Sequence, residues 1–212
     1  MKLVLQKGQN IFFTSDTHYN HTNICRGVSN WPAGSRTRDF DTLDQMNACM
    51  VDNINHMVGE NDILFHLGDW SFGGFENIEE FRNRIVCKNI HLMLGNHDHH
   101  IERDKGGIRR FFQSVNEYLR LEVSWQGTDK VHKRTFILCH YPIASWHDMN
   151  RGVIHLHGHV HLEPHLRIAE GRAMDVGMDG NGMEPVSLRK VLTLLDNRPI
   201  RTLSLPSDHH SD

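Results

Sequence analysis

The segment Leu156-His157-Gly158-His159-Val160-His161 carries histidines at alternate positions, and His155 extends the pattern toward the N-terminus. In an extended segment, side chains at i and i+2 lie on the same face, so His159 and His161 can direct two imidazoles at one point. Gly158 leaves the backbone room to turn or to approach another segment closely. Neutral imidazole is the most common protein ligand of transition metals. The segment therefore predicts part of a metal site, which needs further ligands from other segments.

Composition is that of one soluble globular domain. The chain has 212 residues, of which 38% are hydrophobic and 23% charged. We expect a single domain over residues 1–212, with a polar, loosely ordered tail at 198–212. No run of 18 apolar residues is present, so no membrane span is expected. A formal net charge of -3 argues against duplex DNA as a dominant partner.

The cysteines indicate a reducing compartment. They are widely spaced and form no CxxC pair (Cys25, Cys49, Cys87 and Cys139). This favours reduced, mostly buried thiols over a disulfide framework or a zinc ribbon. The N-terminal sequence MKLVLQKGQN becomes polar too soon for a signal peptide. We therefore expect a cytoplasmic protein.

Strand and helix patterns alternate in the first half of the chain, which predicts an α/β fold with a largely parallel sheet. Expected here are β structure at 4–14 broken by a turn, strands at 62–67 and 89–94, and helices at 41–58 and 75–86. The methionines of the 41–58 helix are expected to pack in the core. The second half is expected to be more antiparallel, with strands at 119–125, 131–139, 153–156 and 173–176, and helices at 108–115 and 186–195.

Five of these strands end in polar clusters, where open α/β sheets build their sites. The clusters supply Asp16, His18, Asp69, Asn96, His140, His159 and His161. This set has oxygen and nitrogen donors but no thiolate, which argues against a structural zinc site. Seven ligands are too many for one tetrahedral ion and suit two ions that share a carboxylate. Two divalent ions about 3.5–4 Å apart can activate a bridging water and hold the oxygens of a phosphoryl group.

The charge of such a site also favours a phosphate substrate. Two divalent ions bring four positive charges, whereas Asp16, Asp69 and a bridging hydroxide remove three, so the site stays positive. Taken alone, Asp16 can instead be a turn residue, and Asp98 a helix N-cap.

Together the clusters resemble the five-block signature of the calcineurin-like metallophosphoesterase superfamily. The blocks are Asp16-x-His18, Gly68-Asp69, Gly95-Asn96-His97-Asp98, His140 and Gly158-His159-x-His161, in the family's order. The His21-x-Asn23-Ile24, Asp175-Val176-Gly177 and Pro185-Val186-Ser187-Leu188 segments are similar to those of small bacterial and phage phosphoesterases.

The resemblance implies a four-layer sandwich, with two mixed β-sheets packed together, helices outside, and the active site at the carboxyl ends of strands. It also implies ligand roles. One ion would take Asp16, His18, Asp69 and His161, and the other Asp69, Asn96, His140 and His159, so that Asp69 bridges. His97 would contact the phosphate or protonate the leaving oxygen, with Asp98 orienting it. His155 and His157 would lie outside the ligand set.

The expected activity is hydrolysis of a phosphomonoester or small phosphodiester by a metal-bridging hydroxide. The alternatives are a nuclease acting on single-stranded nucleic acid, a protein phosphatase and a non-catalytic metal-binding scaffold. Mn²⁺ is the expected metal, with Fe, Zn²⁺ and Ni²⁺ as alternatives. Weaker candidates for substrate contact are His21, Arg26 and Arg151. A nucleotide is among the possible substrates, and the sequence leaves the oligomeric state open.

Overall fold

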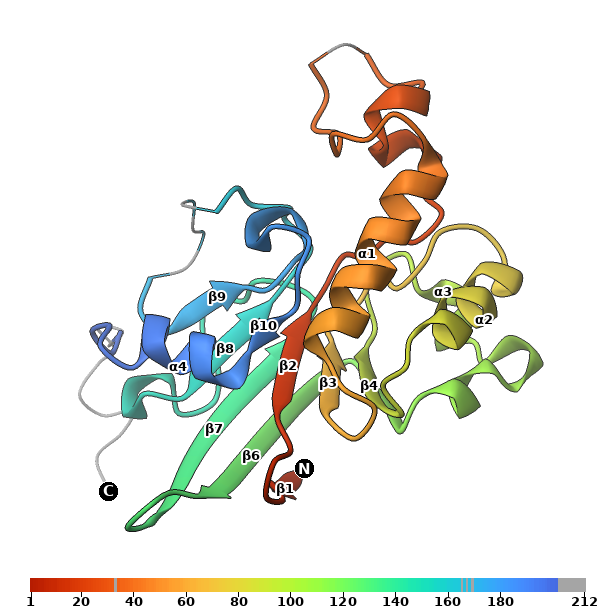
Figure 1. The fold of residues 1–212 in the computed structure, drawn as a ribbon. Helices are drawn as coiled ribbons and strands as arrows, with labels where there is room; N and C mark the ends of the chain where they lie inside the picture. The colour runs from red at the N-terminus through yellow and green to blue at the C-terminus, as the bar shows by residue number, and fades with distance from the viewer. Residues whose placement is uncertain (33, 165, 167, 169, 202–212) are drawn as a thin grey trace.

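Two five-stranded sheets form the centre of the molecule (Figure 1). The computed structural model describes residues 1–32, 34–164, 166, 168 and 170–201. The strand order is β10-β2-β3-β4-β5 in one sheet and β1-β6-β7-β8-β9 in the other. The strands are β1 Lys2–Val4, β2 Ile11–Thr14, β3 Ile63–His66, β4 Asn89–Met93, β5 Ser114–Asn116, β6 Tyr118–Gln126, β7 Val131–Cys139, β8 Ile154–His157, β9 Ala173–Asp175 and β10 Val186–Ser187.

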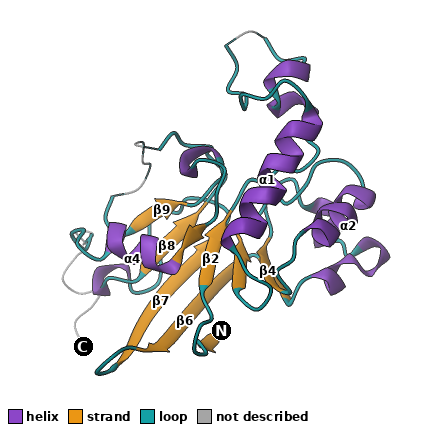
Figure 2. Cartoon of the chain, in the orientation of Figure 1, coloured by secondary structure: helices purple, strands orange, loops and turns teal. Residues whose placement is uncertain are grey.

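Helices lie outside the sheets (Figure 2). The α-helices are α1 Leu43–Met57, α2 Phe75–Arg84, α3 His99–Glu102 and α4 Leu188–Leu195. Short 3-10 segments are η1 Thr22–Ile24, η2 Arg26–Val28, η3 Lys105–Phe111, η4 Met149–Arg151 and η5 Asp179–Asn181. Helix α1 begins with a capping box, in which the Thr42 side chain accepts from the main chain of Gln45 and the Gln45 side chain accepts from Thr42. Both sheets are mixed and flanked by helices, which confirms the predicted fold class.

The first sheet is parallel over β2, β3, β4 and β5, with β10 added antiparallel at its edge. Strands β2 and β3 are buried along their whole length, because one sheet face meets the second sheet and the other meets helices. In register, Thr14 pairs with His66, and His66 with Leu92. The residues that follow these three strands therefore emerge side by side at one edge.

The second sheet is less antiparallel than predicted. Strands β6 and β7 form a long antiparallel hairpin, but β7, β8 and β9 are all parallel to one another, and β1 is parallel to β6. The parallel order has a consequence for the site. It brings the carboxyl ends of β7 and β8 to one edge, where His140 follows the first strand and His159 and His161 follow the second.

Hydrophobic side chains fill the space between the sheets. Phe13 lies between Phe65 and Phe136, with ring centroids 5.8 and 5.6 Å apart. On the outer face of the first sheet, Met46 and Met50 of α1 are fully buried, which confirms that the methionine stripe is core. On the outer face of the second sheet, Trp146, Met149 of η4 and Val153 pack against Ile137 and Ala173.

Two predicted helices were wrong in part. The segment expected as a helix at 108–115 is the 3-10 segment η3 followed by strand β5. The end of this segment pairs with β4 as strand β5, and Gly106 and Gly107, with φ of 70° and 67°, separate its start from α3. The helix expected at 186–195 begins at Leu188, because Val186 pairs with Phe13 as strand β10 and Ser187 caps the helix by accepting from the main-chain N of Lys190.

Other expectations concern the cysteines and the chain end. All four cysteines are free, with Cys25, Cys87 and Cys139 buried. Of the expected loose tail, Arg198 and Arg201 donate hydrogen bonds to the main-chain oxygens of Ala173 and Ala144, whereas 202–212 lie outside the described residues. No helix in the described part of the chain is both long enough and apolar enough to cross a bilayer.

Candidate metal centre

The ligands predicted from the sequence meet at one edge of the two sheets. They come from the loops after β2, β3, β4, β7 and β8. Main-chain hydrogen bonds tie these loops to one another. Asp16 N donates to Gly68 O at 2.9 Å, His18 N donates to Asp69 O at 3.0 Å, and Gly158 N donates to His140 O at 2.9 Å. These bonds join the β2 loop to the β3 loop, and the β8 loop to the β7 loop.

Five of the seven predicted ligand residues have a left-handed backbone. Their φ values are 55° for Asp16, 47° for His18, 57° for Asp69, 74° for His159 and 46° for His161. Residues other than glycine rarely adopt this region, although Asp, Asn and His tolerate it best. Such conformations cluster at functional sites, where the surroundings enforce them.

This backbone corrects the expected basis of the His159 and His161 pairing. Strand β8 ends at His157, so neither imidazole lies on an extended segment. The two side chains reach the centre because left-handed turns redirect them, not because alternate residues of a strand share a face.

A close approach of two loops explains why Gly158 is a glycine. A Cβ atom at this position would lie 2.0 Å from Ser15 Oγ and 2.3 Å from Asp16 Oδ2. The main-chain N of His159 instead donates to both carboxylate oxygens of Asp16, at 3.1 and 3.0 Å. The β8 loop therefore orients the Asp16 carboxylate through its backbone.

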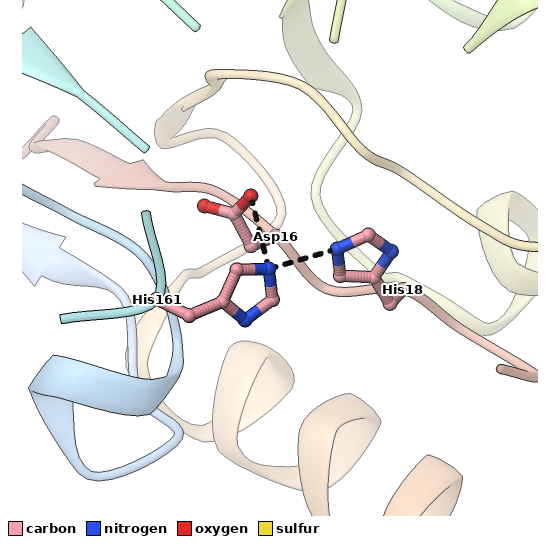
Figure 3. A group of neighbouring side chains, drawn as sticks. All are labelled: Asp16, His18 and His161. Atoms are coloured by element: carbon pink, nitrogen blue, oxygen red, sulfur yellow. Dashed lines mark hydrogen bonds and ion pairs between the residues drawn. The ribbon is translucent and has the colours of Figure 1, made fainter. Parts of the chain in front are cut away.

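The first cluster of ligand atoms joins Asp16, His18 and His161, whose donor atoms lie within 4.8 Å of one another. Figure 3 shows one ring nitrogen of His161 facing both other residues. This atom, Nε2, is 3.1 Å from Nε2 of His18 and 3.7 Å from Oδ1 of Asp16. Asp16 is fully buried, and burial raises the pKa of its carboxyl to about 8.

The second cluster lies around Asp69. Its Oδ1 accepts a hydrogen bond from the main-chain N of His97 at 2.9 Å. Its Oδ2 lies 3.4 Å from Nε2 of His18 and 3.5 Å from Nε2 of His140. One carboxylate oxygen thus faces imidazoles from both sides of the centre. Asp16, Asp69 and His140 also have donor atoms within 4.8 Å of one another.

Asn96 completes this side of the centre. Its Oδ1 lies 3.0 Å from Nε2 of His140 and 2.9 Å from Nδ1 of His159. The amide oxygen therefore stands between two imidazoles, from β7 and β8 respectively. The residues of the second predicted ligand set, Asp69, Asn96, His140 and His159, are all brought together here.

The His140 and His161 rings are each held by a hydrogen bond at Nδ1, on the side away from the centre, and this arrangement fits a bound cation. Nδ1 of His140 lies 2.8 Å from Leu67 O, and a carbonyl only accepts, so Nδ1 carries the proton. Burial lowers the pKa of His140 and keeps the ring neutral. Its Nε2 lone pair therefore points at Oδ1 of Asn96 and Oδ2 of Asp69. Three acceptors that face one another are satisfied together by a positive ion.

His161 is arranged in the same way. Nδ1 of its ring donates to Asp179 Oδ2 at 2.8 Å, which leaves the Nε2 lone pair for the centre. Asp179 is held by Arg38, whose Nε and one terminal nitrogen bind its two oxygens, each at 3.0 Å. Burial alone would raise the pKa of Asp179, but the Arg38 charge and the His161 hydrogen bond hold it well below its usual range. The carboxylate is therefore charged and able to fix the His161 tautomer.

A cavity of about 1040 Å³ opens beside the first cluster. His18, His21, His97 and His161 are among its lining residues. The His97 ring lies 5.3 Å from the His18 ring, edge to face. His97 is thus exposed to the cavity and next to the ligand atoms, as the predicted phosphate contact requires.

Comparison with known proteins agrees with this geometry. A family model for calcineurin-like phosphoesterases matches residues 10–190. The chain belongs to the calcineurin-like phosphoesterase family. This family is metal-dependent, and the structure has two groups of Asp and His side chains that could hold a metal ion.

Individual relatives match most of the length of this calcineurin-like protein. It is 26% identical to "Uncharacterized protein MJ1445" of Methanocaldococcus jannaschii over 92% of this chain and 96% of that protein. It is 28% identical to the gene 66 protein of Mycobacterium phage D29, over 80% of this chain and 88% of that protein. A solved structure of a protein of unknown function, AQ665 from Aquifex aeolicus, has a TM-score of 0.60 at 21% identity, covering 89% of this chain and 100% of that one. The last likeness shows the fold alone.

The remaining predicted residues lie at different places around this calcineurin-like centre. His21 lines the cavity. Arg26 does not belong to the lining and pairs with Asp39, while Arg151 pairs with Asp148 at 3.6 Å and is also outside the lining. Their contact with substrate stays a prediction. His155 and His157 are buried in β8, where their Nδ1 atoms bond to the main-chain oxygens of Ile137 and Gly158.

Asp98 does not contact His97 in the way the resemblance implies. Its Oδ2 accepts from the main-chain N of Asp69 and of Gly95, both at 2.8 Å, and its Oδ1 accepts from Trp70 N at 3.0 Å. Among the described residues, no hydrogen bond joins its carboxylate to the His97 ring. Asp98 therefore ties the β3 loop to the β4 loop, and any effect on His97 passes through the backbone.

Arg38 and Asp179 were not predicted from the sequence. Arg38 is almost fully buried and also donates to the main-chain oxygens of Asp16 and Thr17, at 2.5 and 2.8 Å. Arg38 lies in the loop between η2 and α1, and Asp179 is 141 residues away in the chain. A carboxylate partner for a ligand histidine is a general expectation, but five acidic residues stand between His161 and Pro185, and spacing does not select among them.

Proposed function

We propose that the protein is a phosphoesterase that holds two divalent metal ions and hydrolyses a phosphomonoester or a small phosphodiester. The observation that carries this proposal is the position of Asp69. Its Oδ2 lies between Nε2 of His18 and Nε2 of His140, at 3.4 and 3.5 Å. This position supports two adjoining metal sites that share one carboxylate.

When bound, the metal ions would supply positive charge for the phosphoryl oxygens and lower the pKa of a bound water to near neutral pH. The chain's own residues set the positions for this chemistry. Asp179 and Leu67 O fix the tautomers of His161 and His140 so that both present Nε2 to the centre. The backbone N–H groups of His159 and His97 orient the carboxylates of Asp16 and Asp69.

We assign proton donation to the leaving oxygen to His97. It lines the cavity and its main-chain N bonds to Asp69 Oδ1, so its ring is anchored beside the centre without being one of the ligand groups. An imidazole in this position can contact a phosphate oxygen and pass a proton to the departing alkoxide. We expect this step to contribute about 10²–10⁴-fold to the rate.

A direct test compares an aryl phosphomonoester with the matching bis-aryl diester, in chelator and after addition of Mn²⁺. Mn²⁺ is proposed as the first metal because oxygen and nitrogen ligands suit it, and Fe, Zn²⁺ and Ni²⁺ follow as alternatives. Wild type should hydrolyse at least one ester only with metal. His97→Ala should lose about 10²–10⁴-fold in kcat while it binds metal as before. The matched control is His132→Ala, at the opposite end of β7, which should retain full activity.

Two outcomes would contradict the proposal. Activity that survives Asp69→Ala would rule out the shared carboxylate as the basis of the centre. Tight metal binding by wild type without turnover of either ester would indicate a metal-binding scaffold on the same fold. The ratio of monoester to diester turnover then assigns the enzyme to one of the two reaction types.

A further inference from the structure

The cavity beside the first cluster is much larger than a phosphate group needs. Its volume is about 1040 Å³, and only His18, Arg38, His97, His161 and Asp179 in its lining belong to the centre or its support. Sites for whole organic ligands typically have roughly 300–1,000 Å³. The rest of the cavity therefore has room for the organic part of a phosphate ester, and its lining shows which kind.

Aromatic rings form one wall of this cavity. The His21 ring stacks flat on Phe72, with centroids 3.9 Å apart and planes inclined by 9°. Trp31 meets His21 at 89° with centroids 5.8 Å apart, and Phe72 lies 5.5 Å from His97. The wall thus runs from Trp31 through His21 and Phe72 to His97, next to the ligand atoms.

Two rings of this wall face solvent to an unusual extent. Trp31 is 43% exposed and Phe72 is 38% exposed, and both line the cavity. Exposed aromatic side chains that gather in a concave site mark a binding surface. A flat, apolar face of the ligand is what would cover them.

Three polar side chains of the same cavity have no partner among the residues that the structure describes. Arg36 makes no hydrogen bond or ion pair with the described residues, whereas the neighbouring Arg38 uses its whole guanidinium on Asp16, Thr17 and Asp179. The side-chain hydroxyls of Ser35 and Thr37 likewise have no partner among the residues that the structure describes. A purely hydrocarbon ring would leave these donors and acceptors unpaired, at a cost in binding.

We propose that this cavity binds a nucleotide, with the base against Trp31 and Phe72, the polar edge of the base or the ribose toward Ser35, Arg36 and Thr37, and the phosphate at the metal centre. The position of the phosphate rests on the proposed phosphoesterase function, whereas the position of the base concerns the cavity alone. A nucleobase is flat, and its edge carries hydrogen-bonding groups, so it matches both features of the lining. Stacking on an aromatic side chain is worth about 10-fold to 100-fold in affinity per base.

The test measures binding without turnover. It uses the methylene phosphonate analogues of adenosine 5′-phosphate and of ribose 5-phosphate, whose P–C bond is not hydrolysed and which differ only in the base. Equilibrium dialysis in Mn²⁺ should give an adenosine analogue bound at least about 10-fold more tightly than the ribose analogue. Trp31→Ala and Phe72→Ala should each remove most of this difference and leave the affinity for the ribose analogue as in wild type.

Two matched variants separate stacking from general damage. Phe75→Ala removes another exposed phenylalanine, 45% exposed and outside the lining, and should keep the full difference between the analogues. Trp31→Phe keeps a flat ring and should retain most of the difference. Because Trp31 and Phe72 are both exposed, we expect all four variants to melt within a few degrees of wild type.

Equal affinity for the two analogues in wild type would overturn the nucleotide proposal, even in an active phosphoesterase. Base-dependent binding that is lost in Trp31→Ala would support it, even if wild type hydrolysed no ester and the proposed function failed. A short single-stranded oligonucleotide provides the second arm. Preference for the oligonucleotide by more than about 100-fold over the mononucleotide analogue would overturn the mononucleotide reading in favour of nucleic acid.

Discussion

Nδ1 of His161 donates a hydrogen bond to Oδ2 of Asp179 at 2.8 Å, and this bond decides which ring nitrogen faces the ligand cluster. Arg38 binds the same carboxylate through two nitrogens and is almost completely buried. An imidazole held in this way presents the Nε2 lone pair without having to select a tautomer when metal binds. Asp179 therefore acts on the metal centre without belonging to the ligand set.

Replacing Asp179 by alanine should weaken metal binding by about 10–100-fold, because His161 loses the acceptor that fixes its tautomer. A titration of metal-free protein with Mn²⁺ in competition with a chelator measures this change. The control is Asp196→Ala, which removes a carboxylate paired with Arg134 at 2.7 Å, away from the cluster. Asp196→Ala should bind metal as wild type does, and an Asp179→Ala protein with unchanged metal affinity would show that the hydrogen bond is dispensable.

The three hydrogen bonds to Asp98 predict a different effect from the loss of His97. Asp98→Ala should lower the free energy of unfolding by about 3 kcal/mol, because buried N–H groups of Asp69, Trp70 and Gly95 lose their acceptor. It should also weaken metal binding, because the Asp69 loop is released.

His97→Ala provides the comparison for Asp98. It should reduce kcat but leave metal affinity and stability close to those of wild type. Urea unfolding and Mn²⁺ titration of both variants measure the difference. If the two variants shared one kinetic defect with metal affinity intact, Asp98 would be acting through His97, as the family resemblance implies.

The sequence was sufficient to predict which strand ends supply the candidate ligand residues, because this depends on strand order. A buried run such as Ile11-Phe12-Phe13 indicates a strand, and the polar residues after it lie at the carboxyl edge. Parallel strands bring those edges together whatever the details of each loop. Asp16, Asp69 and His140 were found in this way, and the structure places them within 4.8 Å of one another.

The structural features that were not predicted from the sequence depend on loop conformation and on contacts between distant segments. The left-handed backbone of His159 and His161 follows from how their loop packs on Ser15 and Asp16, so alternation of histidines suggested a strand where there is a turn. The pairing of Arg38 with Asp179 joins two loops 141 residues apart and has no local pattern. The helix predicted at 108–115 failed because pairing with β4 outweighs the helical tendency of that segment.

The close packing of Gly158 against Asp16 predicts that Gly158→Ala is severely damaging. The added Cβ would lie 2.3 Å from Asp16 Oδ2 and 2.0 Å from Ser15 Oγ, so a ligand carboxylate or its loop must move. We expect metal affinity to fall by at least about 10-fold and stability by about 1–3 kcal/mol. Gly59→Ala, where the added atom would lie 3.2 Å from the nearest atom, a side-chain oxygen of Asp62, is the control and should have little effect on metal binding. Wild-type metal affinity in Gly158→Ala would show that the two loops separate easily.

His66 gives a prediction about pH. Its Nε2 lies 2.8 Å from Thr17 Oγ1, the Thr17 hydroxyl donates to Trp70 O at 2.6 Å, and Gly68 N donates to His66 Nδ1 at 3.2 Å. The ring is therefore neutral with its proton on Nε2. Complete burial lowers the pKa of His66 to about 3.

Unfolding releases this ring to take up a proton near pH 6.5, so the unfolded state binds more protons between about pH 3 and 6.5. The contribution of His66 to stability is thus complete above pH 6.5 and is lost as the pH falls toward 3. In chelator, wild type should lose about 1.5 kcal/mol more than His66→Gln between pH 6.5 and 5, measured by urea unfolding. Thr17→Ala removes the same hydrogen bond and no titrating ring, so it should be less stable at both pH values but keep the wild-type slope. An unchanged slope in His66→Gln would mean that the buried ring accepts a proton in the folded protein.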